Sequence, residues 1–429
     1  MEKLYSINIR SIVQSIKAEG WAFIFICAYL FFEYVRPQSI YTQINILPYV
    51  PVILSFAFVA ALVNGEFGKA RPISLNKLMV VYGIIVLISS LLSRHPEISL
   101  SSLRVFFDWF IIYFLIVSII NNERRFFIFF LSFLIYSFKM SQHGFRSWAM
   151  RGFSYTGWGV TGAPGWFHNS GEVGIQMCIY IPLAIAFIVG VYKYLSRPWL
   201  VFFVLMPITG LGTAIATSSR GAIVGLAGAG IWSILRRPKT LIIGGLLLGI
   251  VSLVVIQVMP DAFAERFDTI GEDRTSRHRL ERLEHGIEAM NQHPIFGVGF
   301  EAWTEYYPRN FVLRDEGTLL VHNIFVQCGS ELGYSGLMVF CLMILACFMT
   351  TRKVRRLAKD KEDKFLSVLS YGFDVGLVGF LVSGSFVTVL YYPYFWIHCA
   401  MTTCLHTAAV KKYSEGQGPG ETEEQEDPA

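Results

Sequence analysis

Long apolar runs alternate with short polar segments along most of the 429-residue chain. Twelve of these runs are long enough for a helix to cross a bilayer, some of them with tilt or local thinning. They fall near residues 21–35, 46–63, 77–93, 105–120, 126–138, 173–190, 199–217, 221–235, 240–258, 334–350, 366–387 and 390–409. The pattern therefore predicts an all-α polytopic membrane protein with about 12 transmembrane helices.

The composition agrees with this prediction, since 54% of the residues are apolar and only 16% are charged. The mean hydropathy of +0.50 is well above that of soluble domains. Residues 1–20 are expected to form an amphipathic cytoplasmic segment on the membrane surface, and the first apolar run continues as a span rather than a cleavable signal. Residues 411–429 are acidic and are expected to form a disordered cytoplasmic tail.

With the amino terminus in the cytoplasm, the short connections obey the positive-inside rule. Lys139 is then the sole lysine among the cationic residues predicted outside, and the others are arginine. Topology alone would use either residue, whereas the planar donor face of arginine suits phosphate or carboxylate. Two outer segments are too long to be simple connections. An aromatic loop at 139–171 lies within the first nine spans (21–258), and a larger loop at 259–333 precedes the last three (334–410).

An arginine interrupts the apolar pattern at Thr217-Ser218-Ser219-Arg220-Gly221-Ala222. The three residues before Arg220 are of the type that caps helices, so Arg220 is expected beside the first amides and the positive dipole end of a helix. The following run is rich in glycine and alanine, which lets membrane helices approach closely, so Arg220 is expected to face protein. Two positive features at one point favour an anionic ligand such as phosphate.

The aromatic segment 139–171 interleaves tryptophan, phenylalanine and tyrosine with glycine and two arginines, Arg146 and Arg151. It is either an aromatic belt at the membrane interface or a re-entrant flap that stacks on sugar rings or covers a lipid headgroup. His168 and Glu172 could together ligate a metal ion, although helix capping and headgroup contact are the simpler interpretations.

In the larger segment, four apolar residues recur at helical spacing and predict an amphipathic helix over about 276–291 that packs on the membrane domain. They are Leu280, Leu283, Ile287 and Met290. Arg279 lies nearer to this stripe than Arg282 and is expected to turn inward. His322 ends the segment at the predicted membrane boundary, where a histidine is either a structural residue or a general base.

Three segments, taken in order, resemble the O-antigen ligase / Wzy-C superfamily of bacterial membrane glycosyltransferases. They are SSRGA before a small-residue span, RLERLEHGIEAMNQHPIFGVGF in the larger outer segment, and HNIFVQCGSELGYSG before the tenth span. The segment Tyr34-Val35-Arg36-Pro37-Gln38 is also similar to a subgroup of O-glycosylation ligases associated with exosortase systems.

The resemblance implies a twelve-helix fold of the GT-C type with a large, partly helical periplasmic loop in the bacterial inner membrane. It implies transfer of a glycan from undecaprenyl pyrophosphate to an acceptor hydroxyl, on lipid A core or on a protein, at the periplasmic face. Arg220 and Arg279 would hold the pyrophosphate, and His322 would activate the acceptor. Further substrate contacts are expected from Arg146, Arg151, Trp166, His168 and Asn323.

The residues themselves agree with this chemistry. Pyrophosphate is a good leaving group, so an enzyme needs cations to stabilise the developing charge and a base for the incoming hydroxyl. Two arginines and a histidine would supply both, so no metal, cofactor or nucleic-acid partner is expected. Two alternatives stay open at this point. A polymerase of the same superfamily would share these residues, and a secondary transporter of an organic anion would use charges near the membrane centre, such as Asp374.

Overall fold

A computed structural model describes residues 5, 7–67, 73–154, 158–236, 274–311 and 320–414. Within these ranges the chain forms helices and turns and no strand. The helices are α2 (Ile9–Ala18), α3 (Trp21–Tyr34), α4 (Pro37–Ile40), α5 (Tyr49–Val63), α6 (Ser74–Leu91), α7 (Pro96–Ile119), α8 (Glu123–Met150), α9 (Ser170–Val191), α10 (Arg197–Ala216), α11 (Arg220–Arg236), α14 (Arg274–Gln292), α15 (Trp303–Asn310), α16 (Ile324–Asp360), α17 (Lys364–Gly384) and α18 (Pro393–Ser414). Short 3-10 turns lie at Thr42–Ile44 and Tyr192–Tyr194.

The helices follow the predicted spans closely. The predicted span 240–258 lies outside the described residues, and each of the others coincides with a helix. By length and composition, six of the described helices can cross a membrane: Ser74–Leu91, Pro96–Ile119, Ser170–Tyr194, Arg197–Ala216, Ile324–Asp360 and Lys364–Gly384. The chain is thus an all-helical, multi-pass membrane protein, and the count of about twelve crossings stays a prediction.

Several helix boundaries differ from those predicted. Helix α8 continues to Met150 instead of ending near residue 138, so the connection from α8 to α9 is shorter than the predicted segment 139–171. Helix α18 runs to Ser414, four residues into the predicted tail, and the rest of that tail lies outside the described residues. The amphipathic amino-terminal segment forms α2, with Ile12 and Ile16 packed against the core and Ile9 exposed.

Helix α9 lies at the centre of the bundle, where glycines allow close contacts. A β-carbon at Gly379 of α17 would lie 2.7 Å from the carbonyl oxygen of Cys178 in α9. A β-carbon at Gly225 of α11 would lie 2.7 Å from Ser383 Cβ and 3.0 Å from Cys178 Sγ. Membrane helices associate through such small residues because lipid supplies little hydrophobic drive between them. The predicted small-residue face of α11 is therefore a packing surface.

Helix α16 bends at Gly333, whose φ of 70° is in the left-handed region. The bend interrupts the helical hydrogen bonds, and the freed carbonyl groups are satisfied by a loop 30 residues earlier in the chain. The amides of Val298 and Gly299 donate to the carbonyls of Ser330 and Glu331 at 2.8 and 3.1 Å. The segment Gly297-Val298-Gly299 thus fastens the chain after α14 to the start of α16.

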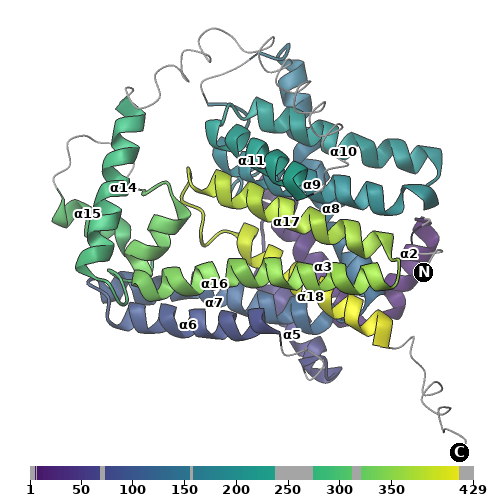
Figure 1. Ribbon diagram of the computed structural model, residues 1–429, viewed down its shortest axis with the longest axis horizontal. Helices are drawn as coiled ribbons and strands as arrows, with labels where there is room; N and C mark the ends of the chain where they lie inside the picture. The colour runs from purple at the N-terminus through teal and green to yellow at the C-terminus, as the bar shows by residue number, and fades with distance from the viewer. Residues whose placement is uncertain are drawn as a thin grey trace, which may run out of the picture.

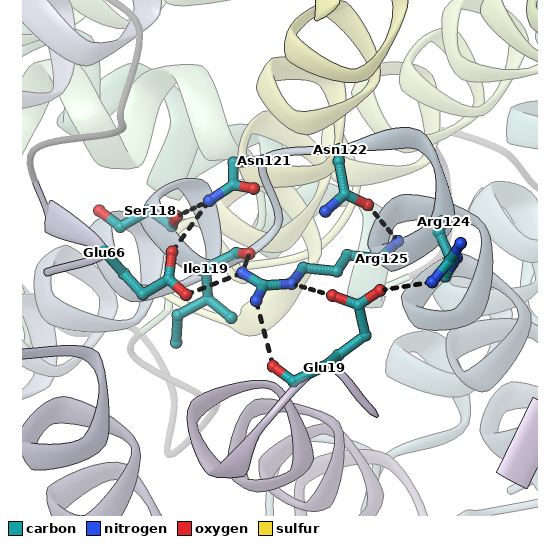
Figure 2. Close-up of polar contacts among 8 residues, drawn as sticks. All are labelled: Glu19, Glu66, Ser118, Ile119, Asn121, Asn122, Arg124 and Arg125. Carbon is teal, nitrogen blue, oxygen red and sulfur yellow. Dashed lines mark hydrogen bonds and ion pairs between the residues drawn. The ribbon is translucent and has the colours of Figure 1, made fainter. Parts of the chain in front are cut away.

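At the opposite end of the bundle, Arg125 joins three connections that are distant in sequence (Figure 2). Its Nε donates to Glu19 Oε2 at 2.7 Å, and its Nη1 donates to Glu66 Oε1 at 3.0 Å. The backbone carbonyls of Ile119 and Glu19 accept two further hydrogen bonds from this guanidinium. Asn121 Nδ2 donates to Glu66 Oε2 at 3.0 Å. One largely buried guanidinium therefore neutralises two carboxylates and ties the start of α3 to the end of α5 and the α7–α8 connection.

The two ends of the bundle differ in what they hold. In Figure 1, α14 and α15 gather at the left, where α16 begins, while α2 and the end of α18 lie at the right. At the right-hand end, Glu123 Oε1 accepts hydrogen bonds from Tyr5 OH at 2.6 Å and from Lys412 Nζ at 2.8 Å. Midway along the bundle, Asp374 pairs with Arg355 Nη1 at 2.7 Å and accepts from Thr351 at 2.5 Å, so it ties α17 to α16.

Candidate active site

Helix α11 begins with the cap that its sequence predicts. Ser219 Oγ accepts a hydrogen bond from the amide of Ala222 at 3.3 Å, and Ser218 before it has a φ of 54°. Arg220 is the first residue of the helix and is half-buried. Its side chain therefore starts beside helix amides that have no partner within the helix itself, where the dipole favours an anion.

The α17–α18 connection (385–392) links the start of α11 to the start of α16. A β-carbon at Gly221, next to Arg220, would lie 3.1 Å from Phe386 Cβ. Two residues further on, Thr388 Oγ1 accepts a hydrogen bond from the amide of His322 at 2.8 Å. Arg220 and His322 therefore belong to the same end of the bundle, although about a hundred residues separate them in the chain.

His322 is held in a defined position just before α16. Its φ of 58° lies in the left-handed region, which non-glycine residues seldom adopt. Asn323 caps α16, because its Oδ1 accepts from the amides of Phe325 and Val326 at 2.9 and 3.1 Å, and its Nδ2 donates to the carbonyl of Ser385 at 3.3 Å. The cap on one side and Thr388 on the other fix the backbone of His322.

The imidazole of His322 is neutral at physiological pH. Burial lowers its pKa to about 4 from the usual 6.5, and the guanidinium groups of Arg279 and Arg282 act in the same direction. A neutral imidazole can accept a proton, which a general base must do. Both arginines belong to α14, and their charges therefore act on this histidine at the start of α16.

Helix α14 faces the protein with a different side from the one predicted. Leu280 is 57% exposed and Ile287 37% exposed, whereas Arg282 is only 4% exposed. A β-carbon at Gly286, one turn after Arg282, would lie 2.5 Å from Val326 Cγ1 of α16. Of the predicted packing stripe, Met290 is buried as expected, whereas Leu280 and Ile287 are exposed, so this part of the prediction is wrong. Arg279 is half-buried, while Arg282, which lies farther from the predicted stripe, is the more deeply buried of the two.

The other predicted substrate-binding residues lie around the same end. The indole of Trp166 contacts the rings of Trp109 and Tyr392, with centroid distances of 5.7 and 4.8 Å, and its carbonyl accepts from Tyr394 OH at 3.0 Å. Tyr392 and Tyr394 flank the start of α18, so the α17–α18 connection also meets the loop before α9. His168 is exposed in that loop.

Arg146 and Arg151 lie at the carboxyl end of α8. Arg146 is exposed on the helix and Arg151 caps its carboxyl end. Trp148 between them is buried in a cluster with Val160 and Ala216. The carboxyl end of α8 therefore packs beside the end of α10, four residues before Arg220. Among the residues that could hold a metal, Glu172 forms a capping box with Asn169 at the start of α9, which agrees with the capping interpretation.

The sequence of this end of the bundle matches a known family. Residues 205–341 match the family described as O-antigen ligase (Wzy_C), and the matched segment contains Arg220, Arg279 and His322. This segment is similar to the O-antigen ligase family. It starts in α10 and ends in α16, so it includes α11, α14 and the bend at Gly333. Trp166 and His168 lie outside it and come from the loop before α9.

A relative outside this family match points the same way. The chain is 26% identical over 109 residues to the exopolysaccharide production protein ExoQ of Rhizobium meliloti (strain 1021). The alignment covers 24% of this chain and 25% of that protein. The chain thus aligns with about a quarter of the length of a protein that is named for exopolysaccharide production.

Proposed function

We propose that the protein is a glycan ligase that transfers an oligo- or polysaccharide from undecaprenyl pyrophosphate to an acceptor hydroxyl, on lipid A core or on a protein. The reaction would take place at the periplasmic face of the bacterial inner membrane. The observation that carries this proposal is the packing of α14, which holds Arg279 and Arg282, against Val321 and Val326 on either side of His322, whose imidazole is neutral. A base next to cations is the arrangement that transfer from a diphosphate requires.

In the proposed reaction, the acceptor oxygen attacks the anomeric carbon of the first sugar. A new glycosidic C–O bond forms, and the bond between that carbon and the diphosphate oxygen breaks. The electron pair of the broken bond stays on undecaprenyl pyrophosphate, where Arg220 and Arg279 would stabilise the added charge. His322 would take the proton of the acceptor hydroxyl. Guanidinium groups supply the charge stabilisation, so we propose that the transfer proceeds without a metal ion and continues in EDTA.

The decisive experiment offers the protein, purified in lipid nanodiscs, a labelled undecaprenyl-pyrophosphate-linked glycan together with one acceptor class at a time. The acceptors are lipid A core, a serine- and threonine-containing protein, and a second copy of the donor. Label on lipid A core or protein supports a ligase. Uptake of a labelled organic anion into vesicles with no glycan product in any reaction would instead favour the transporter.

A polymerase is the second candidate, because ExoQ is named for exopolysaccharide production. The same residues would serve it, with a sugar hydroxyl of a second lipid-linked glycan as the acceptor. The donor-only reaction decides between the two. A polymerase gives a ladder of lengthened lipid-linked glycans without any added acceptor, whereas a ligase leaves the donor length unchanged.

A further inference from the structure

Arg282 is a deeply buried cation with little to neutralise it. Its side chain exposes 4% of its surface, and its Nε is buried without a hydrogen-bond partner. Nη1 donates to the carbonyl of His278 at 3.1 Å, and the guanidinium carbon lies 5.9 Å from the ring centroid of Tyr307. Within the described ranges, no carboxylate forms an ion pair with Arg282. A buried charge without a counter-ion is unfavourable unless a ligand supplies one.

Two other largely buried arginines have carboxylate partners. Arg125 contacts Glu19 and Glu66, and Arg355 contacts Asp374 at 2.7 Å. Arg282 is 4% exposed, whereas the side chains of Arg125 and Arg355 are 12% and 17% exposed. Arg282 is thus more deeply buried than these two, and no carboxylate of the described residues pairs with it, so an anionic ligand can supply its counter-ion.

Arg282 lies on the face of α14 that meets the start of α16. Gly286, one turn later on that face, is so close to α16 that a β-carbon there would lie 2.5 Å from Val326 Cγ1 and 3.6 Å from Val321 Cγ1. Val321 directly precedes His322. The guanidinium of Arg282 is therefore on the same side of α14 as the proposed base, and its electrostatic effect on His322 agrees with this placement.

We propose that Arg282 is a third anion-binding arginine of this site and contacts the diphosphate of a polyprenyl diphosphate together with Arg279. This inference rests on the proposed function, because it takes the donor lipid as the ligand. The planar guanidinium can offer its unpaired Nε and remaining Nη donors to phosphate oxygens as a pair. The three-residue spacing places Arg279 and Arg282 next to each other on one helix, so both can reach a single diphosphate.

The test measures binding of undecaprenyl pyrophosphate, without any acceptor, to the full chain in nanodiscs. Undecaprenol, which has the same chain and no phosphate, is the control ligand. Arg282→Gln should weaken binding of undecaprenyl pyrophosphate at least tenfold and leave undecaprenol binding unchanged. Arg277→Gln is the matched control variant, because Arg277 is exposed on the same helix, and it should change either affinity less than twofold.

A second variant guards against a folding defect. Arg282→Lys keeps the charge and loses the paired donors, so it should bind undecaprenyl pyrophosphate more weakly than the wild type while its melting temperature stays close to wild type. The inference is overturned if Arg282→Gln binds undecaprenyl pyrophosphate like the wild type. It is also overturned if Arg282→Gln loses as much affinity for undecaprenol as for undecaprenyl pyrophosphate. If Arg282→Gln does not fold, wild-type affinity of Arg282→Lys for undecaprenyl pyrophosphate overturns it.

Experiments can contradict the proposed function and the inference about Arg282 independently of each other. A wild-type protein that binds undecaprenyl pyrophosphate through Arg282 but transfers no glycan contradicts the ligase proposal alone. A wild-type protein that transfers glycan while Arg282→Gln binds undecaprenyl pyrophosphate normally contradicts this inference alone.

Discussion

Replacing Arg125 with alanine tests how much the buried ion network stabilises the bundle (Figure 2). The substitution removes the cation that contacts Glu19 at 2.7 Å and Glu66 at 3.0 Å. Glu66 is only 3% exposed, so it would keep a charge inside the protein without this cation, although Asn121 still donates to it. Removing one partner of such a buried pair costs about 3–5 kcal/mol. We expect Arg125→Ala to lower the free energy of unfolding by that amount.

Unfolding of the purified protein by SDS, followed by tryptophan fluorescence, measures this free energy. The neighbouring Arg124 provides a control, because its side chain is 56% exposed and lies 3.5 Å from the same Glu19. Arg124→Ala should cost less than about 1 kcal/mol. Adding Glu66→Gln to Arg125→Ala should recover about 1 kcal/mol or more, since the amide carries no charge. Equal losses for Arg125→Ala and Arg124→Ala would refute the reasoning.

Three further predictions concern the site and the α16 bend. Glycan transfer should be abolished by each of the variants Arg220→Ala, Arg279→Ala and His322→Ala, while the protein still inserts into membranes. Arg279→Lys should also transfer no glycan, because a point charge loses the paired donor geometry of arginine. Normal transfer by any two of the alanine variants would contradict the proposed site. Burial and the nearby guanidinium groups lower the pKa of His322 to about 4, so the base stays neutral until the pH falls towards that value. We therefore expect kcat/KM to stay constant down to about pH 5 and then to decline. A decline of kcat/KM centred near pH 6.5 would show an unperturbed histidine or a different base. Gly333→Ala should lower the free energy of unfolding by about 1–3 kcal/mol, because its φ is 70° and the new β-carbon would lie 2.5 Å from the Ile295 backbone; an SDS titration that matches the wild type would rule out strain at the bend.

The helix positions could be predicted because each span is a long apolar run, and its length is fixed by the bilayer. The cap at Ser219 and the small-residue face of α11 could also be predicted from the sequence, since both depend on residues that are neighbours in the chain. The orientation of α14 could not be predicted in this way. The prediction assumed that apolar residues such as Leu280 and Ile287 turn towards the protein, whereas lipid accommodates them equally well. Arg282 was missed for this reason, and the pair Arg282 and Gly286, one helical turn apart, was the signal available.

Contacts between segments that are distant in the chain could not be predicted from the sequence. Nothing local indicates that Val298 donates to the carbonyl of Ser330, or that Thr388 binds the amide of His322. These bonds bring the arginines and the histidine to one end of the bundle. The motifs predicted which types of residue would form the site. The folded backbone determines which other residues lie beside them.

Glu123 accepts hydrogen bonds from Tyr5 near the amino terminus and from Lys412 in the last helical turn. A truncation at one terminus would therefore remove a partner from a carboxylate that also holds the other terminus. Shortened versions made for crystallisation should keep residues 5 to 412 to preserve this anchor. Tyr5 and the end of α18 lie at the end of the bundle away from the start of α16, so this anchor can be altered without touching the residues beside His322.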